Sequence, residues 1–96
     1  MSTIARLQRW YADQCDGHWE HAYGIKLMTL DNPGWSITIS LEGTALEGKS
    51  FEKVSIERAK ADWLSCRVEK EQFLADGGPG NLDEMLLIFL DWAQQP

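Results

Sequence analysis

The chain has 96 residues, a hydrophobic fraction of 44% and a formal net charge of −6. This length fits one domain over residues 1–96, and the hydrophobic fraction is that of a globular protein, which excludes a disordered chain. No apolar run approaches the roughly 20 residues that a membrane helix needs, and the first residues lack a signal peptide's apolar stretch. We therefore expect a cytoplasmic protein that does not bind a membrane.

The acidic residues are spread along the chain. Residues 1–48 hold three basic and six acidic residues, and residues 49–96 hold six basic and nine acidic ones. Contacts with phosphates need clustered Lys and Arg, so this distribution disfavours nucleic-acid binding. A basic protein partner is compatible with the charge. The two cysteines, Cys15 and Cys66, are expected to be reduced thiols in a cytoplasmic chain.

Apolar residues at helical spacing predict a first helix over residues 3–14, with Ser2 or Thr3 as its N-cap. The apolar residues are Ile4, Leu7, Trp10 and Tyr11. The helix is expected to end near Cys15–Gly17, because glycine adopts the left-handed conformation that often closes a helix. Residues 24–30 then predict a strand.

The segment Asn32–Trp35 predicts a tight turn. Pro33 fixes φ at the second position, and Gly34 accepts the positive φ that a type II turn requires at the third. Residues 35–41 alternate strictly, so that one set of side chains faces the core and the serines and threonine face outward. The inward set is Trp35, Ile37, Ile39 and Leu41. These features predict a hairpin with one solvated face.

Two further strands are predicted over residues 51–56 and 63–69, the latter with inward-facing Leu64, Cys66 and Val68. Gln72–Leu74 is predicted to form a short turn that packs Phe73. The run Gly77–Gly80 is predicted to break the regular structure.

Asn81, followed three residues later by Glu84, predicts a capping box at the start of a last helix. This helix is apolar nearly all round, which is typical of a central element or of an interface between copies of a chain. The order of elements predicts an α+β fold: an antiparallel sheet of about four strands with an N-terminal and a C-terminal helix packed on it.

Cys15, His18 and His21 have a spacing that could gather three metal ligands on one loop, with Asp16 and Glu20 as oxygen donors. No second group of ligands occurs elsewhere, so no metal or other cofactor is expected. The alternative is that His21 hydrogen-bonds backbone or carboxylate groups at a helix–strand junction.

Thiol catalysis is the other enzymatic possibility for this segment. Cys15 is predicted at a helix C-terminus, where the dipole raises the pKa of a thiol. Cys66 is predicted on the inward face of a strand, where a thiol is usually structural. Glu20 and His21 are adjacent in a segment expected to be extended, and would point to opposite faces. A small metal- or thiol-dependent enzyme thus remains an alternative function, and we expect a protein that is not an enzyme.

The chain contains five tryptophans. Trp35, Trp63 and Trp92 fall on or beside predicted apolar faces and are expected in the core. Trp19 and Tyr23 lie in the irregular segment before the first strand. They either lock the fold or belong to a protein-binding surface, where exposed aromatic residues ringed by acids are typical.

The order of motifs along the whole chain resembles the immunity protein 53 family of bacterial polymorphic-toxin systems. The resemblance rests on Trp10-Tyr11, Gln14-Cys15-Asp16-Gly17, Trp19-Glu20-His21, Tyr23-Gly24, Thr29–Trp35, Asp62-Trp63 and the terminal Asn81-Leu82 to Phe89–Trp92 pattern. It implies a small cytoplasmic protein, a monomer or homodimer, that binds and neutralises a cognate toxin domain without catalysis.

The acidic surface suits a basic toxin such as a nuclease, because complementary charge speeds association. The residues expected to face the toxin are Asp16, Trp19, Glu20, His21 and Tyr23. Pro33, Gly34 and Trp35 are expected to serve the turn and the core, together with Trp63 and Trp92.

Overall fold

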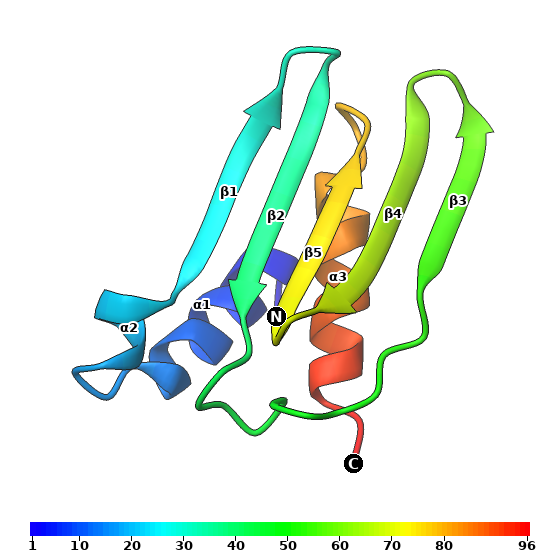
Figure 1. Ribbon diagram of the computed structural model, residues 1–96. Helices are drawn as coiled ribbons and strands as arrows, with labels where there is room; N and C mark the ends of the chain where they lie inside the picture. The colour runs from blue at the N-terminus through cyan, green and yellow to red at the C-terminus, as the bar shows by residue number, and fades with distance from the viewer.

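The protein folds into one antiparallel sheet with its two longer helices on the same face (Figure 1). The computed structural model describes residues 1–96, and the α+β class is confirmed. The elements are α1 (Thr3–Gln14), α2 (Trp19–Ala22), β1 (Ile25–Leu30), β2 (Gly34–Ser40), β3 (Val54–Ala59), β4 (Asp62–Glu69), β5 (Gln72–Gly77) and α3 (Leu82–Ala93).

The sheet has five strands in the order β1-β2-β5-β4-β3, and every neighbouring pair is antiparallel. The expectation of about four strands is therefore one strand short. The missing strand is β5, the central one, which covers the segment predicted as a turn around Phe73. The third strand also begins at Val54, three residues later than predicted.

The turn between β4 and β5 lacks the residues by which a hairpin is usually recognised in a sequence. Lys70 and Glu71 both have positive φ, 51° and 59°, and connect the paired residues Glu69 and Gln72. Two-residue hairpin turns of this kind normally use Asn-Gly or Asp-Gly. Here the tertiary structure holds two ordinary residues in that conformation.

The first helix forms as predicted. Ser2 is its N-cap, and the Ser2 hydroxyl accepts a hydrogen bond from the Ala5 amide at 3.1 Å. Leu7 is the buried residue of α1, and it joins a core made by α3 and the helix-facing side of the sheet. Arg6 links the two helices by donating to Asp91 and Gln94 of the α3 end.

The last helix supplies much of the core. Its buried residues are Met85, Leu86, Phe89, Leu90 and Trp92. It packs against β5 and α1, so its broad apolar surface serves the centre of this fold. Gly77 of β5 makes room for it, because a Cβ there would lie 2.9 Å from the Met85 side chain. No helix in the structure is long and apolar enough to span a membrane.

The first hairpin forms where predicted, but its turn differs from the type II prediction. Gly34 does not have positive φ; it is the first residue of β2 and pairs with Leu30. The Asn32–Pro33 peptide bond is cis. Glycine is required at position 34 for space, because a Cβ would lie 2.2 Å from the Gly77 carbonyl oxygen on the neighbouring strand.

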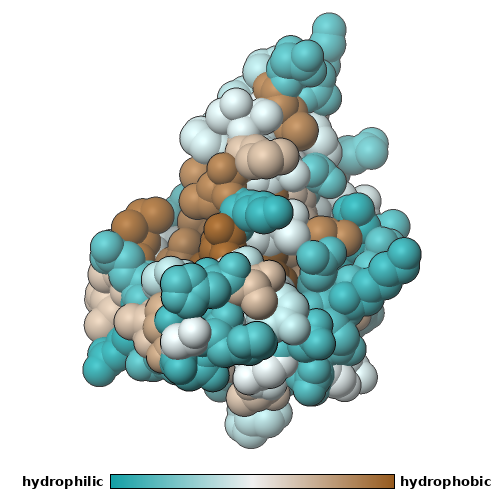
Figure 2. Space-filling view, turned by 60° about the vertical axis from the view of Figure 1, so that its left-hand side comes forward, coloured by the Kyte–Doolittle hydropathy of each residue, from teal (hydrophilic) through white to brown (hydrophobic).

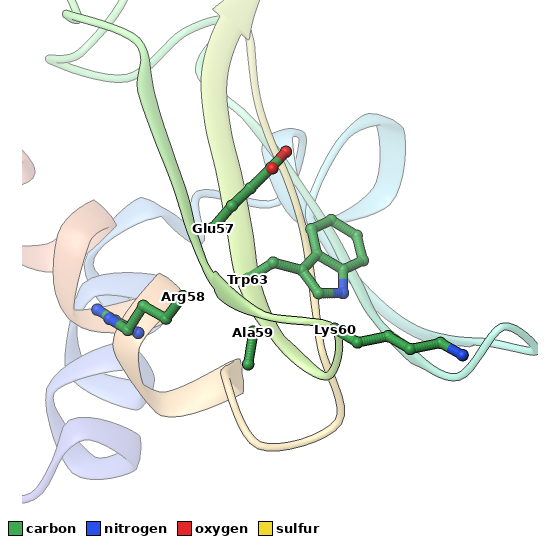
Figure 3. A pocket seen from close by; sticks show the side chains of 5 residues that line it. All are labelled: Glu57, Arg58, Ala59, Lys60 and Trp63. Atoms are coloured by element: carbon green, nitrogen blue, oxygen red, sulfur yellow. The ribbon is translucent and has the colours of Figure 1, made fainter.

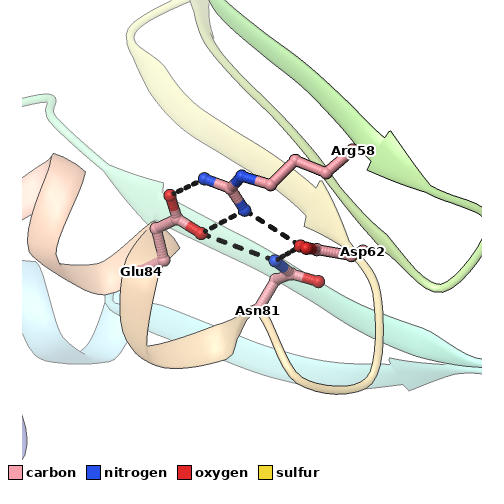
Figure 4. Close-up of polar contacts among 4 residues, drawn as sticks. All are labelled: Arg58, Asp62, Asn81 and Glu84. Atoms are coloured by element: carbon pink, nitrogen blue, oxygen red, sulfur yellow. Dashed lines mark hydrogen bonds and ion pairs between the residues drawn. The ribbon is translucent and has the colours of Figure 1, made fainter.

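The capping box predicted for α3 is replaced by a larger polar cluster, the Arg58 network, which consists of Arg58, Asp62, Asn81 and Glu84 (Figure 4). Asn81 is the N-cap residue, yet its side chain accepts no capping hydrogen bond and instead donates to Asp62 at 2.9 Å. Arg58 donates to both oxygens of Glu84. The network joins the β3–β4 hairpin to the start of α3.

The tryptophans expected in the core take different positions. Trp92 is buried, and its indole N–H donates to the Ser50 carbonyl at 2.8 Å. Trp35 is half-buried and packs against the core cluster. Trp63 lies on the opposite, uncovered face of the sheet and is not part of that cluster. Figure 3 shows its ring on the same side of the hairpin as Glu57, which pairs with it.

Candidate protein-binding surface

The residues that the sequence singles out gather at one corner of the molecule, between α1 and the start of β1 (Figure 1). We call residues 15–23, together with Glu42 and Glu47 of the β2–β3 loop, the α2 corner. The segment expected to be extended contains a short helical turn, α2. Glu20 and His21 are therefore part of a helical turn and not of an extended segment. The expectation that they point to opposite faces, which assumed an extended backbone, does not apply.

Asp16 caps α2. Its Oδ1 accepts hydrogen bonds from the amides of His18 at 2.9 Å and Trp19 at 3.0 Å. An aspartate before a helix satisfies amides that have no partner inside the helix. These hydrogen bonds, that from Trp19 first, lower the pKa of Asp16.

Glu20 closes the same turn from the other side. Its carboxylate accepts hydrogen bonds from the amides of Asp16 at 3.0 Å and Gly17 at 2.8 Å. Its own amide contributes first, followed by those of Asp16 and Gly17, to lowering the pKa of Glu20. Asp16 and Glu20 thus form a reciprocal cap that fixes the loop between α1 and α2.

Trp19 anchors the corner to the core. It is only 3% exposed and makes an edge-to-face contact with Trp10, with ring centroids 5.7 Å apart. Trp10 in turn meets Phe89 of α3 at 4.9 Å. The Trp19 indole N–H has no hydrogen-bond partner. Of the five residues expected to face a toxin, Trp19 therefore lies in the interior and not at the surface.

Tyr23 and His21 lie at the surface of the corner. The Tyr23 ring meets His18 edge to face at 5.8 Å, and the Glu42 carboxylate, with burial and then Glu47, raises the pKa of Tyr23. Tyr23 also lines a hollow of about 110 Å³ together with residues of the uncovered face of the sheet, among them Lys26 and Thr38. His21 is exposed to solvent.

The potential metal ligands do not converge. Cys15 Sγ donates to the Tyr11 carbonyl at 3.3 Å, while His18 packs on Tyr23. No three His, Cys, Asp or Glu side chains of the structure are arranged to hold a metal ion. Cys66 is fully buried, and burial raises the pKa of its thiol to about 12. That thiol is therefore protonated at neutral pH.

The charge of the α2 corner is not neutralised within the protein. Three arginines, Arg6, Arg58 and Arg67, make all the ion pairs, and their partners lie on β4, β5 and α3. The corner acids Asp16, Glu20, Glu42 and Glu47 take no part in them. The corner thus presents negative charge, with Tyr23 and His21, to solvent.

Sequence reasoning missed Glu42 and Glu47, because only the folded loop brings them to Tyr23. It also missed where the large hydrophobic residues are exposed. The large exposed hydrophobic residues of the protein all lie within residues 1–28, on α1, its N-terminal flank and β1. They are Met1, Ile4, Tyr11, Leu27 and Met28.

The family model of Immunity protein 53 matches residues 4–94. No curated protein matches the chain. No solved structure matches it either. The family match covers all three helices except Thr3, all five strands and the α2 corner, and it confirms the resemblance inferred from the order of motifs. The chain therefore belongs to the immunity protein 53 family.

Proposed function

We propose that this protein binds a cognate bacterial toxin domain and neutralises it by direct contact, without catalysis. The observation that carries the proposal is the family match over residues 4–94. An immunity protein acts by association, and the surface that best fits this task is the α2 corner. We place its site of action in the cytoplasm.

Three properties of the corner support the proposal. Its backbone is held by the reciprocal cap of Asp16 and Glu20, so little conformational entropy is lost on binding. Its acids have no internal cation. It also offers Tyr23, an aromatic residue of the type that dominates the energy of many interfaces.

This charge favours a toxin domain with a basic surface, as nucleases have. Long-range attraction between an acidic inhibitor and a basic toxin raises the association rate, which matters because an unbound toxin acts on the cell that makes it. Asp16 and Glu20 contribute to this field even while their carboxylates bind backbone amides, since those hydrogen bonds leave the negative charge in place.

The test is co-expression with the toxin domain encoded beside this chain. We expect the chain to restore growth and to co-purify with that domain at a fixed ratio. A Tyr23→Ala variant should rescue less well and elute from the toxin at lower salt. If the wild-type chain neither rescues growth nor co-purifies, it does not neutralise that toxin by contact, and the proposal is wrong.

A further inference from the structure

The connection between β2 and β3 spans residues 41–53 and contains no helix or strand. We call its first part, residues 41–48, the acidic loop. The amide and the hydroxyl of Thr44 both donate to the Leu41 carbonyl, and the Leu46 amide donates to the Thr44 hydroxyl. Leu41 and Leu46 are buried in the core. Connections of this length without secondary structure are uncommon in compact domains and are usually either disordered or functional. The acidic loop is ordered.

Both ends of the acidic loop bind one residue of the β4–β5 turn, Glu71. The Leu41 amide donates to the Glu71 carbonyl at 2.9 Å, and the Gly48 amide donates to the Glu71 carboxylate at 3.0 Å. We call this pair of hydrogen bonds the Glu71 clasp. Between the two bonded ends the loop exposes Glu42 and Glu47, which are its only charged residues. A loop whose ends lie this close together and whose own side chains pack inside it is frequently functional.

Glu71 has a backbone conformation that is rare for its residue type. Its φ is 59°, in the left-handed region, and it follows Lys70, whose φ is 51°. A glycine would adopt this conformation without strain. Residues other than glycine that are held at such angles cluster at functional sites. The Glu71 side chain makes one hydrogen bond within the protein, and that bond goes to the acidic loop.

The Glu71 clasp lies at the same end of the sheet as α2, the lower end in Figure 1. In Figure 2 the side of the molecule that carries α2 is turned toward the viewer, and hydrophilic side chains dominate the lower part of that view. The Ser40 amide, directly before the acidic loop, donates to the Gly24 carbonyl at 3.1 Å. Gln72, which follows Glu71, lines the same hollow as Tyr23. The acidic loop is thus held between Glu71 and the segment that follows α2.

We propose that Glu71 is a positioning residue for the toxin binding proposed above, on which this role depends. Glu71 fixes the acidic loop, so that Glu42 and Glu47 are presented to the toxin in one arrangement. A loop that is fixed before binding loses little conformational entropy when the partner binds. Glu71 acts in this role as a hydrogen-bond acceptor and not through its charge, and it does so without touching the toxin.

Two variants of similar size separate the hydrogen bond of Glu71 from its charge. Glu71→Gln removes the charge and keeps an oxygen that can accept from Gly48, whereas Glu71→Met removes both the charge and the acceptor. In amide hydrogen exchange measured by NMR on the free chain, the Gly48 amide should exchange about fivefold faster in Glu71→Met than in the wild-type protein. In Glu71→Gln it should exchange at the wild-type rate. Unchanged exchange in Glu71→Met overturns the inference.

The same pair of variants tests binding to the toxin domain encoded beside this chain. The affinity measured by calorimetry should fall about fivefold for Glu71→Met and less than about twofold for Glu71→Gln. Both variants lose the same charge and keep a side chain of similar length, so only the acceptor differs between them. Equal losses for the two variants would mean that the charge of Glu71 acts, and would overturn the positioning role.

A second background separates positioning from a general loss of structure. When Glu42→Gln and Glu47→Gln are already present, adding Glu71→Met should cause no further loss of affinity, because Glu71 acts through those two acids. A loss as large as in the wild-type background would overturn the inference. If the wild-type chain does not bind the toxin, the proposed function fails and the positioning role fails with it, whereas the exchange of the Gly48 amide still decides whether the Glu71 clasp holds the loop.

Discussion

The α2 corner and the Arg58 network hold their carboxylates in opposite ways. At the corner, Asp16 and Glu20 bind backbone amides only a few residues away, and their negative charge stays unbalanced. In the Arg58 network, Asp62 and Glu84 face a guanidinium and tie a hairpin to α3. The first arrangement fixes a loop locally, and its carboxylates make no ion pair within the protein. In the second, the carboxylates form ion pairs that hold elements of the fold together.

The largest expected difference is in the free energy of unfolding of two tryptophan variants. Trp19→Ala removes a buried indole that connects the α2 corner to Trp10, and should lower the free energy of unfolding by ~3–5 kcal/mol. Trp63→Ala removes a half-buried ring from the uncovered face and should cost about 1 kcal/mol or less. Urea denaturation measures both. Equal losses would contradict the assignment of Trp19 to the core and Trp63 to the surface.

Charge reversal at the corner should slow toxin association. In the double variant Glu42→Lys and Glu47→Lys, the association rate measured by stopped flow should fall about tenfold at low salt, and the difference should shrink as salt screens the charges. The matched control, Glu52→Lys with Glu57→Lys, makes the same change in net charge away from the corner. If the control slows association as much, overall charge acts rather than the corner.

Acid should weaken both regions. The pKa values of Asp16, Glu20, Asp62 and Glu84 are all lowered in the folded protein. Their stabilisation is present above the ordinary values of 3.8 and 4.5 and is lost as the pH falls through the lower folded values.

Asp62→Asn and Asp16→Asn should each flatten the decline in stability below pH 3.8, measured by thermal melts against pH. The hydrogen bond from Asn81, followed by that from Arg58, lowers the pKa of Asp62. Added salt should reduce the effect of Asp62→Asn more, because Asp62 is also ion-paired with Arg58 whereas Asp16 has no cation partner. If salt changed the effects of both variants equally, the α2 corner and the Arg58 network would not differ in their dependence on ion pairs.

The smallest effect on stability is expected at His21. This exposed side chain should change the free energy of unfolding by less than about 0.5 kcal/mol when replaced by alanine. The variant should still bind the toxin more weakly, as judged by calorimetry. A stable variant with unchanged affinity would remove His21 from the binding surface.

Much of the architecture follows from local patterns. Periodicity and the Ser2 cap predict α1 over its full length, and strict alternation predicts β2 and β4 with the right faces inward. The strand β5 does not follow from local patterns. Its inward positions after Phe73 are the small residues Ala75 and Gly77, which make room for α3, and small residues have weak strand preference.

The sequence by itself determined the class of fold, the family and the segment that forms the α2 corner, because these depend on residue order and on short-range periodicity. Only the tertiary structure decided that Trp19 is buried, that Trp63 faces outward and that Glu42 and Glu47 raise the pKa of Tyr23. The tertiary structure also decided which carboxylates form ion pairs with an arginine. Those outcomes depend on contacts between distant segments, which no local pattern encodes.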